Sequence, residues 1–315
     1  MLGDQQLNVF LLYEEDCFLS LFCIFNVIFR SMKISDYLQF DEKAKMKRKT
    51  VRVRDISISY LLKDSPQPES TIIFIHGFPF NKNMWIGQLE ALPSEVRGIA
   101  MDVRGHGNTT SGHGFFNMDV FAKDLIAFIE TLKLGRVVVC GISMGGYIAL
   151  RAFELRSDLF SGIVLSDTHS FADTNAGKIK RFATIESVLK HGKRVYAIGF
   201  VANVFSKKSI NEKPEIVDLI KSSIRRNTES GICATLLALA SRTDTTAVLK
   251  EMHVPVLILR GEEDSIVSLE QVKKMEELIP DVKHIEIPDC GHLPNLENPV
   301  RFNGEIRNFL ISKIL

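Results

Sequence analysis

The feature that most constrains the fold is a single serine between a strand-like run and a helical run. Residues 137–140 are apolar and mostly β-branched, and residues 144–153 carry apolar side chains at helical spacing. Gly141 and Gly145 stand two positions before and after Ser143. A strand that turns directly into a helix strains the residue at the corner, so its neighbours two positions away must lack colliding side chains. This Gly-x-Ser-x-Gly spacing is typical of a nucleophile elbow and predicts that Ser143 is a nucleophile.

The chemistry of a serine nucleophile predicts two further side chains. A serine hydroxyl reacts poorly at neutral pH, so it needs a histidine base and a carboxylate that orients the histidine. Asp264 follows a strand-like run at residues 256–259, and His292 stands between the last strand-like run and the last helical run. Both can reach the edge of the sheet at which the corner lies. We therefore expect Asp264 and His292 to complete a triad with Ser143.

Neighbouring carboxylates leave one alternative open. Asp167 also follows a strand-like run and could reach His292, so it is the alternative to Asp264 as the orienting acid. Glu262 and Glu263 precede Asp264 directly, and we expect their side chains to face solvent.

Strand and helix patterns alternate along most of the chain, which predicts an α/β fold with a mostly parallel, doubly wound sheet. Strands buried on both faces need continuous apolar runs. After a two-stranded opening, such runs occur at several places. The expected strands are residues 51–54, 56–62, 72–75, 99–101, 137–140, 163–165, 256–259 and 285–287. The expected helices of the core are residues 84–92, 118–132, 144–153, 269–278 and 300–314.

The alternation breaks once, where amphipathic helical stretches follow one another without a strand between them. These stretches are residues 178–189, 195–205, 215–225 and 229–240. A helical insertion between two strands is expected to form a lid over the carboxyl edge of the sheet, where ligands of open α/β sheets bind. Its candidate apolar lining residues are Phe182, Val188, Tyr196, Phe200, Val204 and Phe205.

The N-terminal region does not share the pattern of the rest. The expected domains are an extension at residues 1–49, a core at residues 50–168 and 253–315, and a helical lid at residues 169–252. Residues 18–29 are strongly apolar, but acidic residues precede them and the run is short for a membrane span. Our preferred hypothesis is that translation starts at Met32 and that residues 1–31 are a start-site artefact. An uncleaved anchor or a signal peptide is the alternative.

Five motifs, the serine corner among them, belong to one pattern: His76-Gly-Phe-Pro, Asp102-Val-Arg-Gly-His-Gly-Asn-Thr, Gly141-Ile-Ser-Met-Gly-Gly, Gly261-Glu-Glu-Asp, and Gly291-His with Glu297-Asn-Pro. From about residue 51 onward the chain resembles the α/β-hydrolase superfamily. Within it, the pattern is most similar to small esterases, 3-oxoadipate enol-lactonases and cofactor-free perhydrolases. The resemblance implies the α/β-hydrolase fold, with Ser143 as nucleophile, His292 as base and Asp264 as its orienter. It also implies an oxyanion hole formed by the backbone N–H groups of Phe78 and Met144.

The remaining histidines near these motifs have simpler interpretations. We expect His76 and the loop at residues 102–107 to support the site without reacting. His106 and His113 lie in a glycine-rich loop, but the third glycine of a dinucleotide-binding motif is missing. Phosphate binding is therefore not expected.

Composition excludes several classes of partner. The formal net charge of +1 favours neither nucleic acid nor an anionic membrane surface, and the basic residues 43–49 are expected to be a solvated segment ahead of the first strand. Cys17, Cys23, Cys140, Cys233 and Cys290 show neither metal-ligand spacing nor a disulfide framework, which favours the cytoplasm. Cys140 and Cys290 are expected to be small buried side chains.

The reaction expected from the triad is acyl transfer to water. The chain is predicted to be a serine hydrolase that cleaves a small carboxylic ester or lactone through an acyl-enzyme on Ser143, without a metal or an organic cofactor. The same side chains would serve carbon–carbon bond hydrolysis or perhydrolysis, and a non-catalytic ligand receptor is a third hypothesis. Neither the substrate nor the oligomeric state follows from the sequence.

Overall fold

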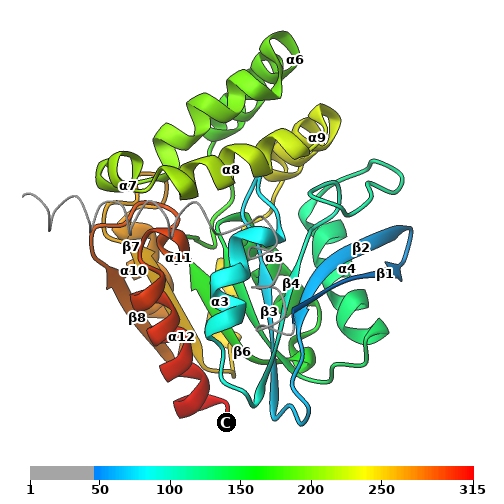
Figure 1. Cartoon of the computed structure of the whole chain (residues 1–315), viewed down its shortest axis with the longest axis vertical. Helices are drawn as coiled ribbons and strands as arrows, with labels where there is room; N and C mark the ends of the chain where they lie inside the picture. Colours follow the sequence, from blue (N-terminus) through cyan, green and yellow to red (C-terminus); the bar gives the residue numbers. More distant parts are fainter. Residues whose placement is uncertain (1–45) are drawn as a thin grey trace, which may run out of the picture. The chain divides into compact units, whose positions relative to one another are not determined.

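The computed structural model describes residues 46–315, which form an α/β unit around an eight-stranded sheet (Figure 1). The strands lie in the order β1-β2-β4-β3-β5-β6-β7-β8. Their bounds are β1 Met46–Val53, β2 Ile56–Lys63, β3 Ser70–Ile75, β4 Val96–Met101, β5 Val137–Ile142, β6 Phe160–Ser166, β7 Val256–Gly261 and β8 Val282–Ile287. β1 pairs antiparallel with β2 and β2 with β4, whereas all the other pairs are parallel. The mostly parallel sheet predicted from the sequence is confirmed.

Helices cover both faces of this sheet (Figure 1). On one face, α3 (Ile86–Ala91), which follows the 3-10 turn η1 (Lys82–Trp85), packs beside α12 (Pro299–Lys313). The side-chain amide of Gln88 in α3 donates to Asn303 Oδ1 in α12 at 2.9 Å. On the opposite face, α4 (Met118–Thr131) packs against α5 (Met144–Leu155). The short 3-10 turns η2 (Ser157–Leu159) and η3 (Thr246–Glu251) precede β6 and β7, and α10 (Leu269–Leu278) and α11 (Pro294–Glu297) follow β7 and β8.

The central strands form the core and determine where the loops meet. β5 and β7 are buried along their whole length, which explains why they are continuous apolar runs in the sequence. β5, β6, β7 and β8 are consecutive neighbours and run parallel, so their carboxyl ends lie along one edge. The loops after these four strands carry Ser143, Asp167, Asp264 and His292.

Between β6 and β7 the chain forms four α-helices, which we call the helical insertion. They are α6 (Asn175–Val204), α7 (Lys207–Glu212), α8 (Pro214–Arg226) and α9 (Glu229–Ala240). α6 packs on α8 and α9 and lies farthest from the sheet in Figure 1. Gly192 interrupts α6 with φ 79° and ψ 160°, a backbone conformation that favours glycine. The separate short helix α7 was not expected from the sequence.

The first strand starts earlier than expected. β1 begins at Met46, so Lys47, Arg48 and Lys49 lie within an exposed strand and not ahead of it. Charged side chains are common on such an edge strand because they discourage pairing with other chains. The hypotheses about residues 1–31 and a start at Met32 concern residues outside the described ones. Across residues 46–315, no helix combines the length and the apolarity that crossing a bilayer would need.

Candidate active site

Ser143 occupies the corner between β5 and α5 in a strained backbone conformation. Its φ is 52° and its ψ is −117°, which L-residues rarely adopt. A Cβ on Gly141 would lie 2.3 Å from the carbonyl oxygen of Gly145, and a Cβ on Gly145 would lie 2.2 Å from that of Ile75. No real Cβ comes that close to a backbone oxygen, so both positions require glycine for the chain to turn here.

The corner leaves the serine accessible. Ser143 is the one residue in the stretch 137–150 that is not buried. Its N–H donates to the carbonyl oxygen of Ser166 at 2.9 Å, and the hydroxyl of Thr168 donates to the Ser143 carbonyl oxygen at 2.8 Å. Because α5 begins at Met144, the free N–H groups of its first turn lie next to this corner.

His292 and Asp264 form a buried hydrogen-bonded pair. Nδ1 of His292 lies 2.9 Å from Oδ2 of Asp264, and Oδ1 of Asp264 accepts from the N–H groups of Ile266 at 2.8 Å and Val267 at 3.3 Å. Burial alone would raise the pKa of Asp264. The charge of His292 and these hydrogen bonds outweigh burial and lower the pKa of Asp264, so this carboxyl is ionised. The neighbouring Glu262 and Glu263 are exposed, as expected.

Two glycines bring the loops of this pair together. A Cβ on Gly261, at the end of β7, would lie 1.8 Å from the carbonyl oxygen of Gly291. The loop that carries Asp264 and the loop that carries His292 therefore touch through their backbones. A side chain at Gly261 would separate the acid from the base.

Glu297 holds the histidine loop in place, a role that the sequence did not reveal. Its carboxylate is 1% exposed; Oε1 accepts from the N–H groups of Gly291 at 2.9 Å and Leu293 at 3.3 Å, on either side of His292. Oε2 accepts from the N–H of Ser206 at 2.8 Å, between α6 and α7. Glu297 thereby fixes the histidine to the helical insertion. Its only signal in the sequence was its place in the motif Glu297-Asn-Pro.

Asp167, the alternative acid, lies beside the pair but does not take the place of Asp264. It is fully buried; Oδ1 accepts from the N–H of Gly261 at 2.8 Å and Oδ2 from the hydroxyl of Ser166 at 2.6 Å. Single side-chain ligand atoms of Asp167, Asp264 and His292 all lie within 4.8 Å of one another. Burial, and after it the charge of Asp264, raises the pKa of Asp167 well above its usual value. Asp167 therefore keeps its proton to a higher pH than an ordinary aspartate does.

These three side chains are also the group within residues 46–315 that is close enough to share a metal ion. Their atoms already have partners, however. His292 Nδ1 faces Asp264, and both carboxyls accept hydrogen bonds from backbone N–H groups. A metal ion would have to displace these bonds, so the donor set fits an orienting pair better than a metal centre.

The loop after β3 places Phe78 next to the serine. A Cβ on Gly77 would lie 3.2 Å from Cβ of Ser143, so this loop touches the corner. His76 supports the loop, because its Nδ1 donates to the Gly77 carbonyl oxygen at 2.8 Å and its Nε2 accepts from the Val103 N–H at 3.1 Å. Burial lowers the pKa of His76 to about 4. The ring therefore stays neutral, so that Nδ1 can donate a hydrogen bond while Nε2 accepts one.

The loop after β4 is a second support. Oδ1 of Asp102 accepts from the N–H of Lys82 at 2.7 Å, and its Oδ2 accepts from the Lys82 ammonium at 2.5 Å and the Asn108 N–H at 2.8 Å. Nδ1 of His106 donates to the Arg104 carbonyl oxygen at 3.0 Å, and burial lowers the pKa of His106 to about 3. These contacts agree with the structural role expected for this loop.

The helical insertion is anchored to both loops and to the histidine. The Asn227 side chain donates to the Pro79 carbonyl oxygen at 2.7 Å and accepts from the Gly107 N–H at 2.9 Å. The N–H of His292 donates to the carbonyl oxygen of Val204 in α6 at 2.9 Å. The insertion is thus attached at three points around the candidate site.

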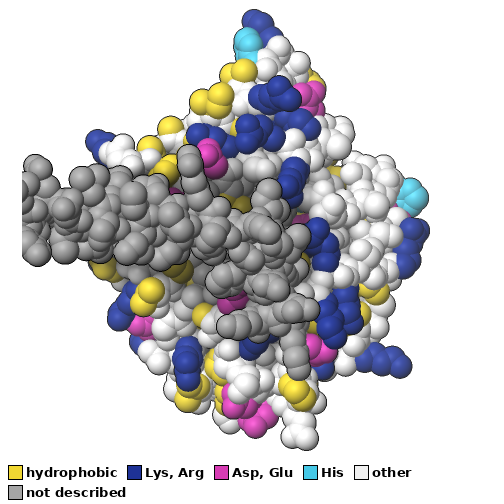
Figure 2. Space-filling view, viewed as in Figure 1, with side chains coloured by type: hydrophobic (Ala, Val, Ile, Leu, Met, Phe, Trp, Pro, Cys, Tyr) yellow, Lys and Arg dark blue, Asp and Glu magenta, His cyan; other side chains and the backbone are white. Residues whose placement is uncertain are grey.

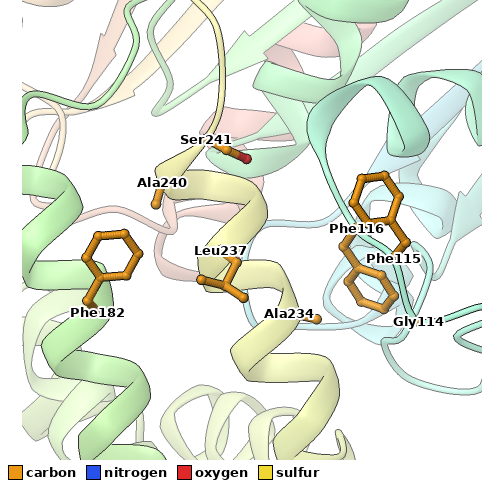
Figure 3. Close-up of a pocket in the computed structure, with 8 residues that line it drawn as sticks. All are labelled: Gly114, Phe115, Phe116, Phe182, Ala234, Leu237, Ala240 and Ser241. Carbon is orange, nitrogen blue, oxygen red and sulfur yellow. The ribbon is translucent and has the colours of Figure 1, made fainter.

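The expected lining residues of the insertion separate into two groups. Val188, Val204 and Phe205 are buried, and the ring of Phe200 meets that of Phe78 edge-on at 6.5 Å. Phe182 differs, because it is 48% exposed and lines a groove that none of the three candidate triad residues lines (Figure 3). Which face of α6 turns inward depends on its packing against α8 and α9, which periodicity alone does not determine.

Two of the described cysteines, Cys140 and Cys290, match the expectation of small buried side chains. Cys140 and Cys290 are buried, and Cys233 is also unpaired. Burial raises the pKa of Cys290 to about 12 and raises that of Cys140 as well. Neither thiol is therefore activated.

Comparison with known proteins gives one consistent result. A family model described as "Alpha/beta hydrolase family" matches residues 72–305. The 3-oxoadipate enol-lactonase 2 of Acinetobacter baylyi is 24% identical over 261 residues, which is 82% of this chain and 94% of that protein. The structure of a thermophilic esterase from Thermogutta terrifontis matches with a TM-score of 0.78 and 30% identity, covering 84% of this chain and 98% of the esterase. The enol-lactonase of Burkholderia xenovorans shares the fold, with a TM-score of 0.77 at 20% identity over 84% of this chain and 100% of that one.

Proposed function

Because the chain belongs to the alpha/beta hydrolase family, we propose that it is a serine hydrolase that cleaves a small carboxylic ester or lactone. The similarity to an esterase at 30% identity and to an enol-lactonase supports this class of acyl substrate. The observation that carries the proposal is the buried pair of His292 and Asp264, 2.9 Å apart, in loops along the same sheet edge as the strained Ser143.

In the proposed mechanism, His292 removes the proton from the Ser143 hydroxyl, and the serine oxygen attacks the carbonyl carbon of the substrate. Asp264 accepts the hydrogen bond from Nδ1 of His292, which leaves Nε2 as the base and stabilises the imidazolium. The backbone N–H groups of Phe78 and Met144 stabilise the tetrahedral oxyanion. His292 then protonates the leaving alkoxide. Water, activated by the same histidine, releases the acyl group from Ser143.

Hydrolysis of p-nitrophenyl esters of rising acyl length tests this proposal. We expect the wild type to cleave the short esters and Ser143→Ala to lose about three orders of magnitude or more in kcat/KM. Ser312→Ala, an exposed serine on α12, is the matched control and should keep full activity. Equal activity in Ser143→Ala and in the wild type would overturn the assignment. Carbon–carbon bond hydrolysis and perhydrolysis would use the same residues, and no contact in the structure favours either one.

We also expect the protein to work in the cytoplasm, where thiols stay reduced. The described cysteines Cys140, Cys233 and Cys290 are unpaired.

A further inference from the structure

α6 carries apolar side chains on two faces, and only one of these faces is packed. Val188, Ala197, Val201 and Val204 are buried against the rest of the protein. A second set, on α6 and α9, exposes between 48% and 67% of its surface. This set, which we call the outer apolar patch, is Ile179, Phe182, Leu189, Val195, Ile198 and Leu237. Helical spacing places the α6 members on one side of each half of that helix, before and after Gly192, because residues three and seven positions apart share a face.

The outer apolar patch continues into a groove (Figure 3). Phe182 of α6 and Leu237 of α9 line this groove together with Phe115 and Phe116, which belong to the loop before α4. Its volume is about 370 Å³. Phe115 is itself 67% exposed. The apolar surface is therefore continuous from the insertion to the core, which is unusual for a face that meets only water.

The helical insertion that carries this patch has an excess of positive residues. The segment from α6 to α9, residues 175–240, holds twelve Lys and Arg residues against five Asp and Glu residues, although the whole chain has a formal net charge of only +1. Two of these cations, Arg181 and Lys208, pair with Asp173 and Asp289 outside the segment. Lys180, Lys190 and Arg194 are exposed on α6 itself. In Figure 2, Lys and Arg side chains with hydrophobic side chains among them lie over the upper part of the molecule, where α6, α8 and α9 lie in Figure 1, and further Lys and Arg side chains run down its right-hand side.

We propose that the outer apolar patch docks on an anionic lipid surface. A helix that presents apolar residues beside Lys and Arg lies in the plane of a membrane interface, with the apolar residues among the acyl chains and the cations at the headgroups. The proposed contact is peripheral, because the apolar side chains of the patch enter the interface while their helices lie along it. This inference goes beyond the proposed function and does not depend on hydrolysis.

The same positive charge argues against a second copy of the chain as the partner that covers the outer apolar patch. A two-fold dimer would place this surface against itself, so that two positive faces would meet. An anionic lipid surface offers acyl chains to the apolar residues and negative headgroups to the cations.

Co-sedimentation with vesicles tests the proposal on the full chain. The vesicles contain either phosphatidylcholine alone or phosphatidylcholine mixed with phosphatidylglycerol, both as diether lipids that an esterase cannot consume. We expect at least about tenfold stronger binding to the vesicles with phosphatidylglycerol, and weaker binding at high salt. Equal binding to both kinds of vesicle, or to neither, would overturn the proposal.

Two triple variants locate the contact. Ile179→Gln, Phe182→Gln and Ile198→Gln together remove apolar side chains of the patch, and Lys180→Gln, Lys190→Gln and Arg194→Gln together remove cations beside it. Each variant should lose about tenfold or more in binding to the anionic vesicles. Glutamine suits helices and the sites are exposed, so folding should persist, which circular dichroism checks.

Matched controls lie elsewhere on the surface. Val300→Gln on α12 removes an apolar side chain that is 85% exposed, and Lys47→Gln with Arg48→Gln and Lys49→Gln removes three exposed cations from β1. Both controls should bind as the wild type does. Loss of binding in the controls, or wild-type binding by both patch variants, would place the contact elsewhere and overturn the proposal. A wild-type dimer that the patch variants convert to monomers, without vesicle binding, would assign the patch to a second copy instead.

Discussion

Asp167 and Asp264 come within 4.8 Å of each other in a buried site, yet only Asp264 forms the hydrogen bond with His292. Two buried carboxyls this close cannot both ionise without a large electrostatic cost. The structure favours the charged form of Asp264 and the protonated form of Asp167. Asp264 has its pKa lowered by His292 and by backbone N–H groups, whereas burial and the charge of Asp264 raise the pKa of Asp167.

The first prediction concerns stability and pH. Folded Asp167 keeps a proton that the unfolded chain releases above the ordinary aspartate pKa of 3.8, so the free energy of unfolding should fall as pH rises from there to the folded pKa. Asp167→Asn cannot ionise. The free energy of unfolding of the Asp167→Asn variant, minus that of the wild type, should therefore increase with pH, by up to about 1.4 kcal/mol per pH unit in that range. Urea unfolding at a series of pH values measures this, and a difference that does not change with pH would contradict it.

The second prediction separates the roles of the two acids in catalysis. Asp264→Asn replaces the acceptor for His292 Nδ1–H and favours the wrong tautomer, so kcat should fall by about three to four orders of magnitude. Asp167→Asn keeps a side chain of nearly the same size and leaves the acceptor for His292 in place, so it should reduce kcat far less. Steady-state kinetics on an ester that the wild type cleaves compares them. A larger loss for Asp167→Asn would make Asp167 the orienting acid.

The third prediction concerns the turn at Ser143. Gly145→Ala would place a Cβ 2.2 Å from the carbonyl oxygen of Ile75, and this backbone cannot move without disturbing β3. We expect a loss of about 3 kcal/mol in the free energy of unfolding. Gly199→Ala, in α6, meets open space and should stabilise the protein by about 0.5–1 kcal/mol. Guanidinium unfolding of both variants checks this, and equal effects would show that the turn is not sterically restricted.

The fourth prediction concerns Glu297. Glu297→Gln exchanges one carboxylate oxygen for an N–H donor that faces backbone N–H groups, so a buried hydrogen bond is lost at a cost of about 1–3 kcal/mol. The loop that carries His292 should loosen, and kcat should fall along with stability. Glu263→Gln is the control, because Glu263 is exposed in the loop after β7. If both variants behave alike, Glu297 does not hold the histidine loop.

The sequence predicted the parts of this site that depend on local geometry. Gly141, Ser143 and Gly145 are close in the chain, and the steric reason for their spacing acts within a few residues. Asp264 and His292 could be expected because polar residues after parallel strands meet at one edge of the sheet. The alternation of strands and helices predicted the mostly parallel sheet, and the resemblance of the motifs implied the α/β-hydrolase fold; both are confirmed.

Features that depend on contacts between distant loops could not be predicted. Glu297 accepts a hydrogen bond from the N–H of Ser206 in the insertion, and the pKa of Asp167 is raised by its burial and by the charge of Asp264, both of which depend on how distant loops pack. The sequence also left open which face of α6 turns outward, so Phe182 was expected to line the substrate pocket. The net charge of +1 concealed the excess of Lys and Arg in the insertion, because the average over a chain carries no information about one face.

The most direct test of the central claim is to identify the residue that carries the acyl group. A fluorophosphonate reacts with an activated serine, and peptide mass spectrometry locates the adduct. We predict one adduct, on the peptide that contains Ser143, with labelling lost in Ser143→Ala and strongly slowed in His292→Ala. An adduct on another residue, or labelling that persists in folded Ser143→Ala, would contradict a serine hydrolase that works through Ser143.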